Sequence, residues 1–179
     1  MPDLIPVTVA DLAAAASGGS RPPGARPVAE VTITVHGTPA PQGSKRGFVV
    51  GKRAIVVDDN KPRLRTWRQD VKDAALAQWA TMLHGPVEVY VAFWLPRPKG
   101  HYGTGRNAGR LRPGSLTEKP AKKPDLDKLL RSTFDGLKEA GIYKDDAQVI
   151  IVQATKQYCP AGQPPGAHVH VREVWEQEP

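Results

Sequence analysis

Four aspartates in the second half of the chain have the residue type and spacing to bind a divalent metal ion. Asp125 and Asp127 are two residues apart at the expected start of a helix, and Asp145 and Asp146 close the loop after that helix. Carboxylates gathered at one point repel one another unless a cation neutralises them, and Mg²⁺ or Mn²⁺ prefers such oxygen ligands. A metal bound there can activate a water and stabilise the leaving oxygen of a phosphodiester. Metal-dependent phosphodiester hydrolysis is therefore the leading expectation.

The separation of the two aspartate pairs places a strict demand on the fold. A helix of about 15 residues is about 22 Å long. Asp146 can therefore join Asp125 and Asp127 only if the loop 142–146 runs back along most of the helix toward its N-terminus. Taken alone, each pair fits a structural interpretation better, because Asp often caps helices and forms turns. Lys128 and Arg131, one turn apart on the helix, can offset charge that develops on a phosphate.

Basic residues are concentrated in two segments of the chain. The formal net charge is +7, and residues 45–68 and 97–123 hold 16 of the 25 Lys and Arg. Both segments include loops or loop edges, where side chains can reach a phosphate backbone. This placement favours nucleic acid as the partner. The expected DNA-binding residues are Lys45, Arg46, Lys52, Arg53, Arg97, Lys99, Lys122 and Lys123.

The spacing of apolar residues predicts the elements that must position these side chains. Alternating residues are typical of strands, and apolar residues three or four positions apart are typical of helices. Glycine and proline mark the boundaries. The expected elements are a strand at 31–35, a hairpin of 48–50 and 54–57 with a basic tip at 51–53, a helix at 63–83, a central strand at 87–95, a long loop at 96–124, a helix at 126–140, and strands at 149–158 and 168–174.

This element order predicts one α+β domain, with a mixed β-sheet packed against two main helices. The domain is expected to span residues 29–175. Residues 1–28, rich in Ala, Gly, Ser and Pro, are expected to form a disordered tail, and 176–179 a second short tail. The aromatic side chains of Trp67 and Trp79 are expected in the core.

Cysteine usage and the N-terminal sequence bear on the compartment. A single cysteine, Cys159, permits no internal disulfide, which fits a reducing compartment. The N-terminal residues lack the charged start and long apolar run of a signal peptide. The sequence contains no apolar run long enough for a membrane span. A cytoplasmic protein is expected.

The motifs around the aspartates resemble those of the RusA family of Holliday-junction resolvases, or crossover junction endodeoxyribonucleases, found in bacteria and phages. That family has Asp-x-Asp-Asn-x-x-Lys opening a helix, followed by Asp-Asp and a polar residue. Here the matching segments are 123–131 and 145–148, with Asp135 where the family often has an acid. The segments 41–46 and 95–99 also match, and the resemblance covers roughly residues 30–175.

The resemblance implies roles for particular residues. It assigns metal binding by Mg²⁺, or Mn²⁺, to Asp125, Asp127 and Asp146. Arg131 stands where the family has a functional lysine, and Lys128 where it has asparagine; arginine keeps the positive charge but cannot give up a proton. The resemblance also implies a homodimer that nicks opposed strands of a four-way junction, consistent with matching two-fold symmetries.

Three other functions remain open at this point. The chain can be a metal-dependent nuclease that acts on flaps, forks or plain duplex. It can also be a DNA-binding protein without catalysis, in which the aspartates are caps and turns. A phosphohydrolase of small molecules is disfavoured, because a small phosphate does not require two long basic segments.

Overall fold

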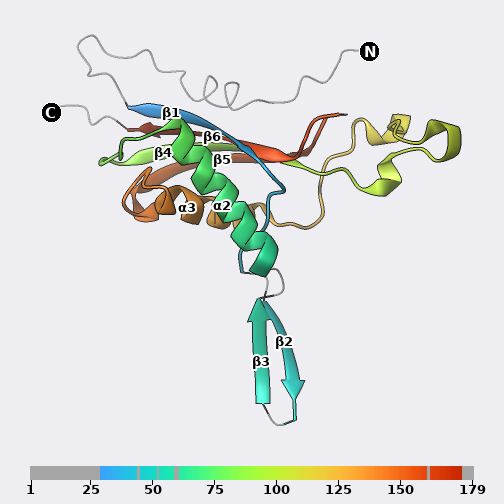
Figure 1. The fold of residues 1–179 in the computed structure, drawn as a ribbon, viewed down its shortest axis with the longest axis horizontal. Helices are drawn as coiled ribbons and strands as arrows, with labels where there is room; N and C mark the ends of the chain where they lie inside the picture. The colour runs from blue at the N-terminus through green and yellow to red at the C-terminus, as the bar shows by residue number, and fades with distance from the viewer. Residues whose placement is uncertain (1–28, 44, 52, 59–60, 161, 175–179) are drawn as a thin grey trace.

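The computed structural model describes residues 29–43, 45–51, 53–58, 61–160 and 162–174. The expected tails at 1–28 and 176–179 lie outside the described residues. The described chain forms an α+β domain with a mixed four-stranded sheet and two helices, which confirms the predicted fold class. Figure 1 shows both helices on one side of the sheet, with a separate β-hairpin and a long loop extending from this body.

The sheet has the strand order β1-β6-β4-β5, so β1 and β5 form its edges. These strands are β1 (Glu30–His36), β4 (Val87–Leu95), β5 (Val149–Tyr158) and β6 (Gly166–Glu173). Strand β4 pairs in parallel with β5 and antiparallel with β6, and β6 pairs antiparallel with β1. All nine residues of β4 are buried, as expected for its near-continuous apolar sequence in the centre of a mixed sheet.

Two helices cover one face of the sheet. Helix α2 (Lys61–Gln78) packs mainly beneath β1, and helix α3 (Leu126–Glu139) packs against α2 and lies near β5. Trp67 on α2 is completely buried and its indole Nε1 donates to Thr133 Oγ1 on α3 at 3.2 Å. Gly136 allows close helix packing, because a Cβ there would lie 2.8 Å from Val71 Cβ.

Helix α2 ends earlier than the apolar pattern predicts. The expected helix reached residue 83, but the helix ends at Gln78. Leu83 instead forms an isolated bridge with Tyr143 and is buried, so its apolar side chain belongs to the core without being helical. Trp79 packs against the core while partly exposed. The three-to-four spacing of apolar residues continues past the end of the helix because the turn after α2 also buries its apolar side chain in the core.

The hairpin consists of β2 (Lys45–Val50) and β3 (Arg53–Asp58) and pairs only with itself among the described strands. Val50 pairs with Arg53, which leaves a two-residue tip that starts at Gly51, with φ +62°. A positive φ suits the tight turns that join hairpin strands. The predicted hairpin is confirmed and is longer than expected. It points away from the sheet and helices (Figure 1).

The long loop 96–124 has regular local structure. Three short 3₁₀ helices, η1 (Lys99–His101), η2 (Gly105–Asn107) and η3 (Pro113–Ser115), lie along it. Arg97 fixes its base, with Nε donating to Cys159 O at 2.8 Å and Nη1 donating to Ser115 O at 2.7 Å. The guanidinium also lies 5.5 Å from the ring centre of Tyr158. The loop is therefore a folded extension of the domain.

Candidate active site

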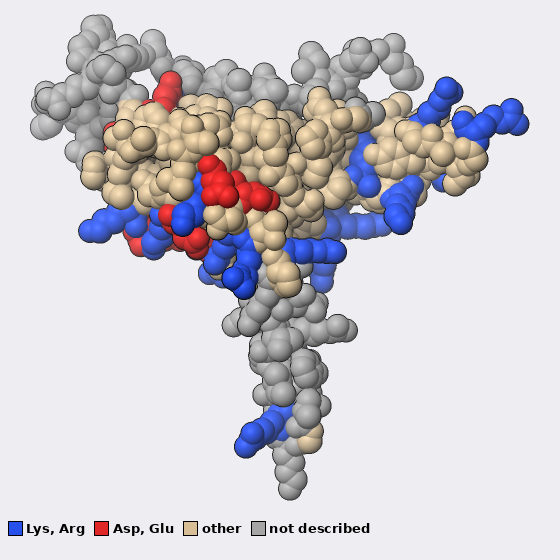
Figure 2. Space-filling model, in the orientation of Figure 1, with Lys and Arg blue, Asp and Glu red and all other residues tan. Residues whose placement is uncertain are grey.

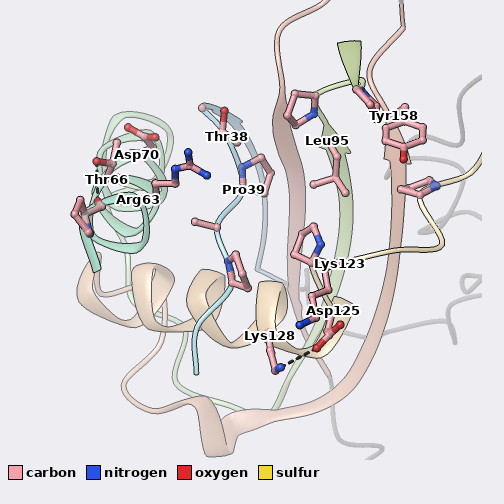
Figure 3. A pocket seen from close by; sticks show the side chains of 18 residues that line it. Thr38, Pro39, Arg63, Thr66, Asp70, Leu95, Lys123, Asp125, Lys128 and Tyr158 are labelled. Atoms are coloured by element: carbon pink, nitrogen blue, oxygen red, sulfur yellow. Dashed lines mark hydrogen bonds and ion pairs between the residues drawn. The ribbon is translucent and has the colours of Figure 1, made fainter. Parts of the chain in front are cut away.

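Asp125 stands at the N-terminus of α3 but does not cap the helix. Its backbone is extended, with φ −72° and ψ 141°, yet none of the described helix amides donates to its carboxylate. Instead Lys128 Nζ lies 2.8 Å from Asp125 Oδ2 (Figure 3). The Asp125 side chain is 44% exposed. The capping interpretation of Asp125 is therefore wrong, and its carboxylate remains accessible at the surface.

Cations around Asp125 keep its carboxylate ionised. The hydrogen bond from Lys128 is the largest cause of the lowered pKa of Asp125, followed by the charges of Lys128, Lys123 and Lys156. The same pair raises the pKa of Lys128. At neutral pH the site therefore holds a negative charge within a basic surround, an arrangement that attracts both a cation and a phosphate.

Lys156, on β5, is a site residue that the sequence motifs did not reveal. Its ammonium donates to the carbonyls of Lys122 at 2.9 Å and Pro124 at 2.8 Å. These bonds attach the segment before α3 to the sheet and fix where Asp125 stands. The only sequence signal is one charged residue in the second half of a predicted strand, and spacing alone could not place it beside residues 122–124.

Asp127 and Arg131 are exposed along α3. Asp127 lies within the first helical turn, where a negative charge is favourable near the positive end of the helix dipole. Arg131 approaches the base of the hairpin, since a Cβ on Gly43 would lie 4.0 Å from Arg131 Nη1. Lys128 is engaged with Asp125. The two basic residues therefore occupy different positions, with Lys128 on the carboxylate and Arg131 facing outward.

A cleft of about 930 Å³ opens beside Asp125. It lies between the start of α2, the segment 37–41, and the carboxyl ends of β4 and β5 (Figure 3). Arg63, Lys123 and Lys128 contribute positive charge to its wall, and Asp70 and Asp125 contribute negative charge. Its size falls within the usual range for ligand pockets.

The segment between β1 and the hairpin is anchored to α3. The backbone N–H of Gln42 donates to the backbone oxygen of Lys128 at 2.9 Å, and Ser132 Oγ donates to the backbone oxygen of Ala40 at 2.6 Å. Arg68 on α2 donates to Gln42 Oε1 at 2.6 Å and forms an ion pair with Asp135. The segment that leads into the basic hairpin is thus held against the helix that carries Asp125.

Asp145 and Asp146 lie at the opposite end of α3. Asp145 accepts hydrogen bonds from Lys138 Nζ at 2.6 Å and from the Ala147 amide at 3.0 Å, and caps the short helix η4 (Asp146–Gln148). These bonds lower its pKa to about 2. Asp145 therefore has a structural role. Asp146 is exposed, beside the C-terminal turn of α3.

The loop 142–146 does not return Asp146 to Asp125 and Asp127 within one chain. Helix α3 has 14 residues, and a rise of 1.5 Å per residue separates its ends by about 21 Å. Lys138, in the last turn, holds the adjacent Asp145 at the far end. In the part of the chain that the structure describes, no group of three His, Cys, Asp or Glu side chains is placed to bind a metal. A single chain does not fit the expected three-carboxylate site.

Basic side chains border the aspartates on several sides. Figure 2 shows Lys and Arg along the edge of the molecule beneath α3 and on the long loop. Lys99, Lys122 and Lys123 are exposed there, whereas Arg97 is partly buried and bound to carbonyls, which indicates a structural role. Arg53 is exposed beside the hairpin tip. Lys52 lies outside the described residues, as do the side chains of Lys45 and Arg46.

Comparison with known proteins defines the class of this domain. The family model described as Endodeoxyribonuclease RusA matches residues 36–172, a range that includes β4, β5, nearly all of β6, both helices and all the aspartates above. The chain therefore belongs to the RusA family of endodeoxyribonucleases. It is also similar to the uncharacterized protein YqaN of Bacillus subtilis (strain 168), with 30% identity over 145 residues, which cover 80% of this chain and 96% of that protein.

No helix within the described residues is both long enough and apolar enough to cross a membrane.

Proposed function

We propose that this protein is a Mg²⁺-dependent endonuclease that resolves four-way DNA junctions by paired, symmetric nicks in recombination and repair. The observation that carries the proposal is the start of α3, where Asp125 and Asp127 stand beside a basic cleft in a chain of the endodeoxyribonuclease family. Mn²⁺ is expected to substitute for Mg²⁺, because the proposed ligands are carboxylates.

The protein's own residues position the substrate and the carboxylates. Lys128 holds Asp125 ionised and oriented, and Lys123, which lines the cleft, attracts the DNA backbone. Arg131, which is exposed, is placed to bind a phosphate through its planar donors. When bound, Mg²⁺ would neutralise the carboxylates and supply Lewis acidity at the phosphate.

The enzyme is proposed to act as a homodimer. A dimer also offers Asp146 a way to join a metal site although it lies at the far end of α3 from Asp125 and Asp127 of its own chain. A two-fold axis that sets two α3 helices antiparallel brings the end of one helix near the start of the other. Asp125 and Asp127 of one protomer would then meet Asp146 of the partner subunit. This arrangement forms two equivalent sites, which suits cleavage of two opposed strands.

The test is cleavage of a synthetic four-way junction by the purified full chain with Mg²⁺. Paired nicks on opposed strands are expected, with loss of about 100-fold or more of the rate in Asp125→Asn, since that change removes a proposed ligand. Asp73→Asn is the matched control, because Asp73 is an exposed acid on α2 that binds Gln69. Absence of nicks in the wild type, or full activity in Asp125→Asn, would refute the proposal.

A junction-binding protein without catalysis is the second candidate function. The observation in its favour is that the described residues of one chain do not gather three carboxylates. Junction binding in Mg²⁺ that never gives a nick would support it. A nuclease of broader specificity differs from both the junction resolvase and the non-catalytic binder in cleaving a linear duplex. Comparing the cleavage rate on the junction with that on a linear duplex of matched sequence tests this difference.

A further inference from the structure

Tyr158 brings an aromatic hydroxyl to the cleft beside Asp125. It is the last residue of β5 and pairs with Leu95, the last residue of β4, and both line the cleft. In open α/β sheets, ligands bind outside the carboxyl ends of parallel strands, and β4 and β5 form such a parallel pair here. The sheet itself therefore places Tyr158 where a ligand is expected.

The aromatic ring of Tyr158 is held by two neighbours from the long loop. The guanidinium carbon of Arg97 lies 5.5 Å from the ring centre, and the ring of His101 packs edge-on with its centre 4.9 Å away. His101 is itself buried, and its Nε2 lies 3.1 Å from Glu118 Oε2. These contacts fix the orientation of the ring. A ligand that binds the hydroxyl therefore loses little free energy to the ordering of this side chain.

The hydroxyl of Tyr158 is not used by the fold. The hydroxyls of Tyr90 and Tyr143 both donate hydrogen bonds inside the domain, whereas none of the described residues binds the hydroxyl of Tyr158. In Figure 3 this hydroxyl points toward the part of the cleft where Lys123 and Asp125 lie. A phenol can donate one hydrogen bond. In a cleft with cations in its wall, an anionic oxygen is the acceptor that suits this donor.

The geometry of β5 sets the position of Tyr158 relative to the candidate metal ligands. Lys156 and Tyr158 lie on the same face of the strand and about 7 Å apart along it, because residues two apart in a strand share a face. Lys156 Nζ donates to the backbone oxygen of Pro124 at 2.8 Å, directly before Asp125 in the chain. Tyr158 therefore stands one step farther along the cleft than the segment that carries Asp125.

We propose that Tyr158 is a substrate-binding residue whose hydroxyl donates a hydrogen bond to a DNA phosphate next to the one held at Asp125. This inference rests on the proposed function, because it requires a DNA strand in the cleft. Arg63 and Lys123 line the same cleft and supply positive charge, whereas Tyr158 supplies a neutral donor in a fixed position. The contact strengthens binding of the strand and takes no part in the reaction at the cleaved bond.

Junction binding by Tyr158→Phe, measured by fluorescence anisotropy without metal, tests this contact. Phenylalanine keeps the ring packing and removes only the hydroxyl. The affinity should fall about 10-fold, as expected for a hydrogen bond to a charged group. The slope of log affinity against log salt should stay unchanged, because a neutral donor releases no counterion. Tyr102→Phe is the matched control: it removes the same atom from the long loop, outside the cleft lining, and should bind as the wild type does.

With Mg²⁺ present, Tyr158→Phe should raise the KM of junction nicking about 10-fold and leave kcat unchanged, because the lost contact binds substrate and transition state equally. Wild-type affinity in Tyr158→Phe would overturn the proposal. Weaker binding with a reduced salt slope would also overturn it, since that result means that the basic loop has moved. A wild type that nicks junctions while Tyr158→Phe matches it refutes this contact alone, whereas a wild type that binds no junction refutes the proposed function and the contact together.

Discussion

At the scale of single residues, the pairing of Lys128 with Asp125 sets the charge of the candidate site. The 2.8 Å contact and the lowered pKa of Asp125 have the same main cause, the Lys128 ammonium. Arg131, in the position of the family's lysine, is exposed and lies near Gly43. Lys128 therefore sets the charge state of the Asp125 carboxylate, and Arg131 is the proposed phosphate contact.

Replacing Lys128 by methionine should raise the pKa of Asp125 toward its ordinary value of 3.8. The sign follows because Lys128 stabilises the ionised carboxylate, which remains deprotonated to lower pH while the lysine is present. The measurement is an NMR titration of the Asp125 side-chain carboxyl in both proteins. An Arg131→Met protein serves as the matched control and should leave the midpoint close to that of the wild type. An unchanged midpoint in Lys128→Met would show that the pair does not control Asp125.

Replacing Arg131 by glutamine should weaken junction binding and reduce its dependence on salt. Loss of one phosphate contact lowers the slope of log affinity against log salt by about 1. Binding measured by fluorescence anisotropy at several salt concentrations gives this slope. The control is Lys72→Gln on α2, away from the cleft-lining residues. Equal slopes for Arg131→Gln and the wild type would exclude a phosphate contact at Arg131.

At the scale of elements, close packing of α2 on α3 places the residues of the site. Gly136 faces Val71 and the carbonyl of Arg68, at 2.8 Å and 3.1 Å from the position of an added Cβ. Any side chain there must push the two helices apart. Because Arg68 also binds Gln42 and Asp135, such a shift reaches the segment that leads into the hairpin.

Gly136→Ala should therefore destabilise the protein, although alanine favours helix. Overpacking costs about 1 to 3 kcal/mol, whereas the gain in helix propensity is about 1 kcal/mol, so a net loss of up to about 2 kcal/mol is expected. Urea denaturation measures the change. Gly114→Ala, at a position with no atom within 4 Å of the added Cβ, should change stability by less than about 0.5 kcal/mol. A Gly136→Ala protein as stable as the wild type would show that the helices are not tightly packed there.

Strand β6 should make the fold sensitive to acid. His168 packs edge-on against Trp94, with ring centres 4.3 Å apart, and burial lowers its pKa from the usual 6.5. A histidine with a lowered folded-state pKa contributes its full stability above pH 6.5, and this contribution is lost as pH falls below that value. As the pH is lowered below 6.5, the temperature of the thermal unfolding midpoint should therefore decrease. This decrease should be less steep in His168→Gln. Parallel curves for the two proteins would contradict this assignment.

Periodicity was enough to predict β4, β5, α3 and the hairpin, because each follows a regular apolar pattern of strand or helix type. It failed where residues distant in sequence meet. The end of α2 was misplaced because Leu83 keeps the apolar spacing in a turn. Lys156 was not found because its partners are the carbonyls of Lys122 and Pro124, and Arg97 was expected on DNA although it fixes the loop base.

At the scale of the whole molecule, the three metal-binding aspartates predicted from sequence are divided between the two ends of α3. The length of the helix alone prevents their meeting in one chain, and Lys138 holds the loop at the far end. A symmetric dimer with antiparallel α3 helices removes this obstacle. Sequence could supply the ligand types, but it could not show that the loop after α3 stays at the far end of the helix.

The most direct test of this account mixes two inactive variants, Asp125→Asn and Asp146→Asn. Each homodimer should be inactive on a four-way junction with Mg²⁺. After subunit exchange, the mixed dimer has one site with Asp125 from one chain and Asp146 from the other, so about one quarter of wild-type nicking should return in the mixture. If each site lay within one chain, both sites of the mixed dimer would lack a ligand. A mixture no more active than either variant alone would then contradict the shared site.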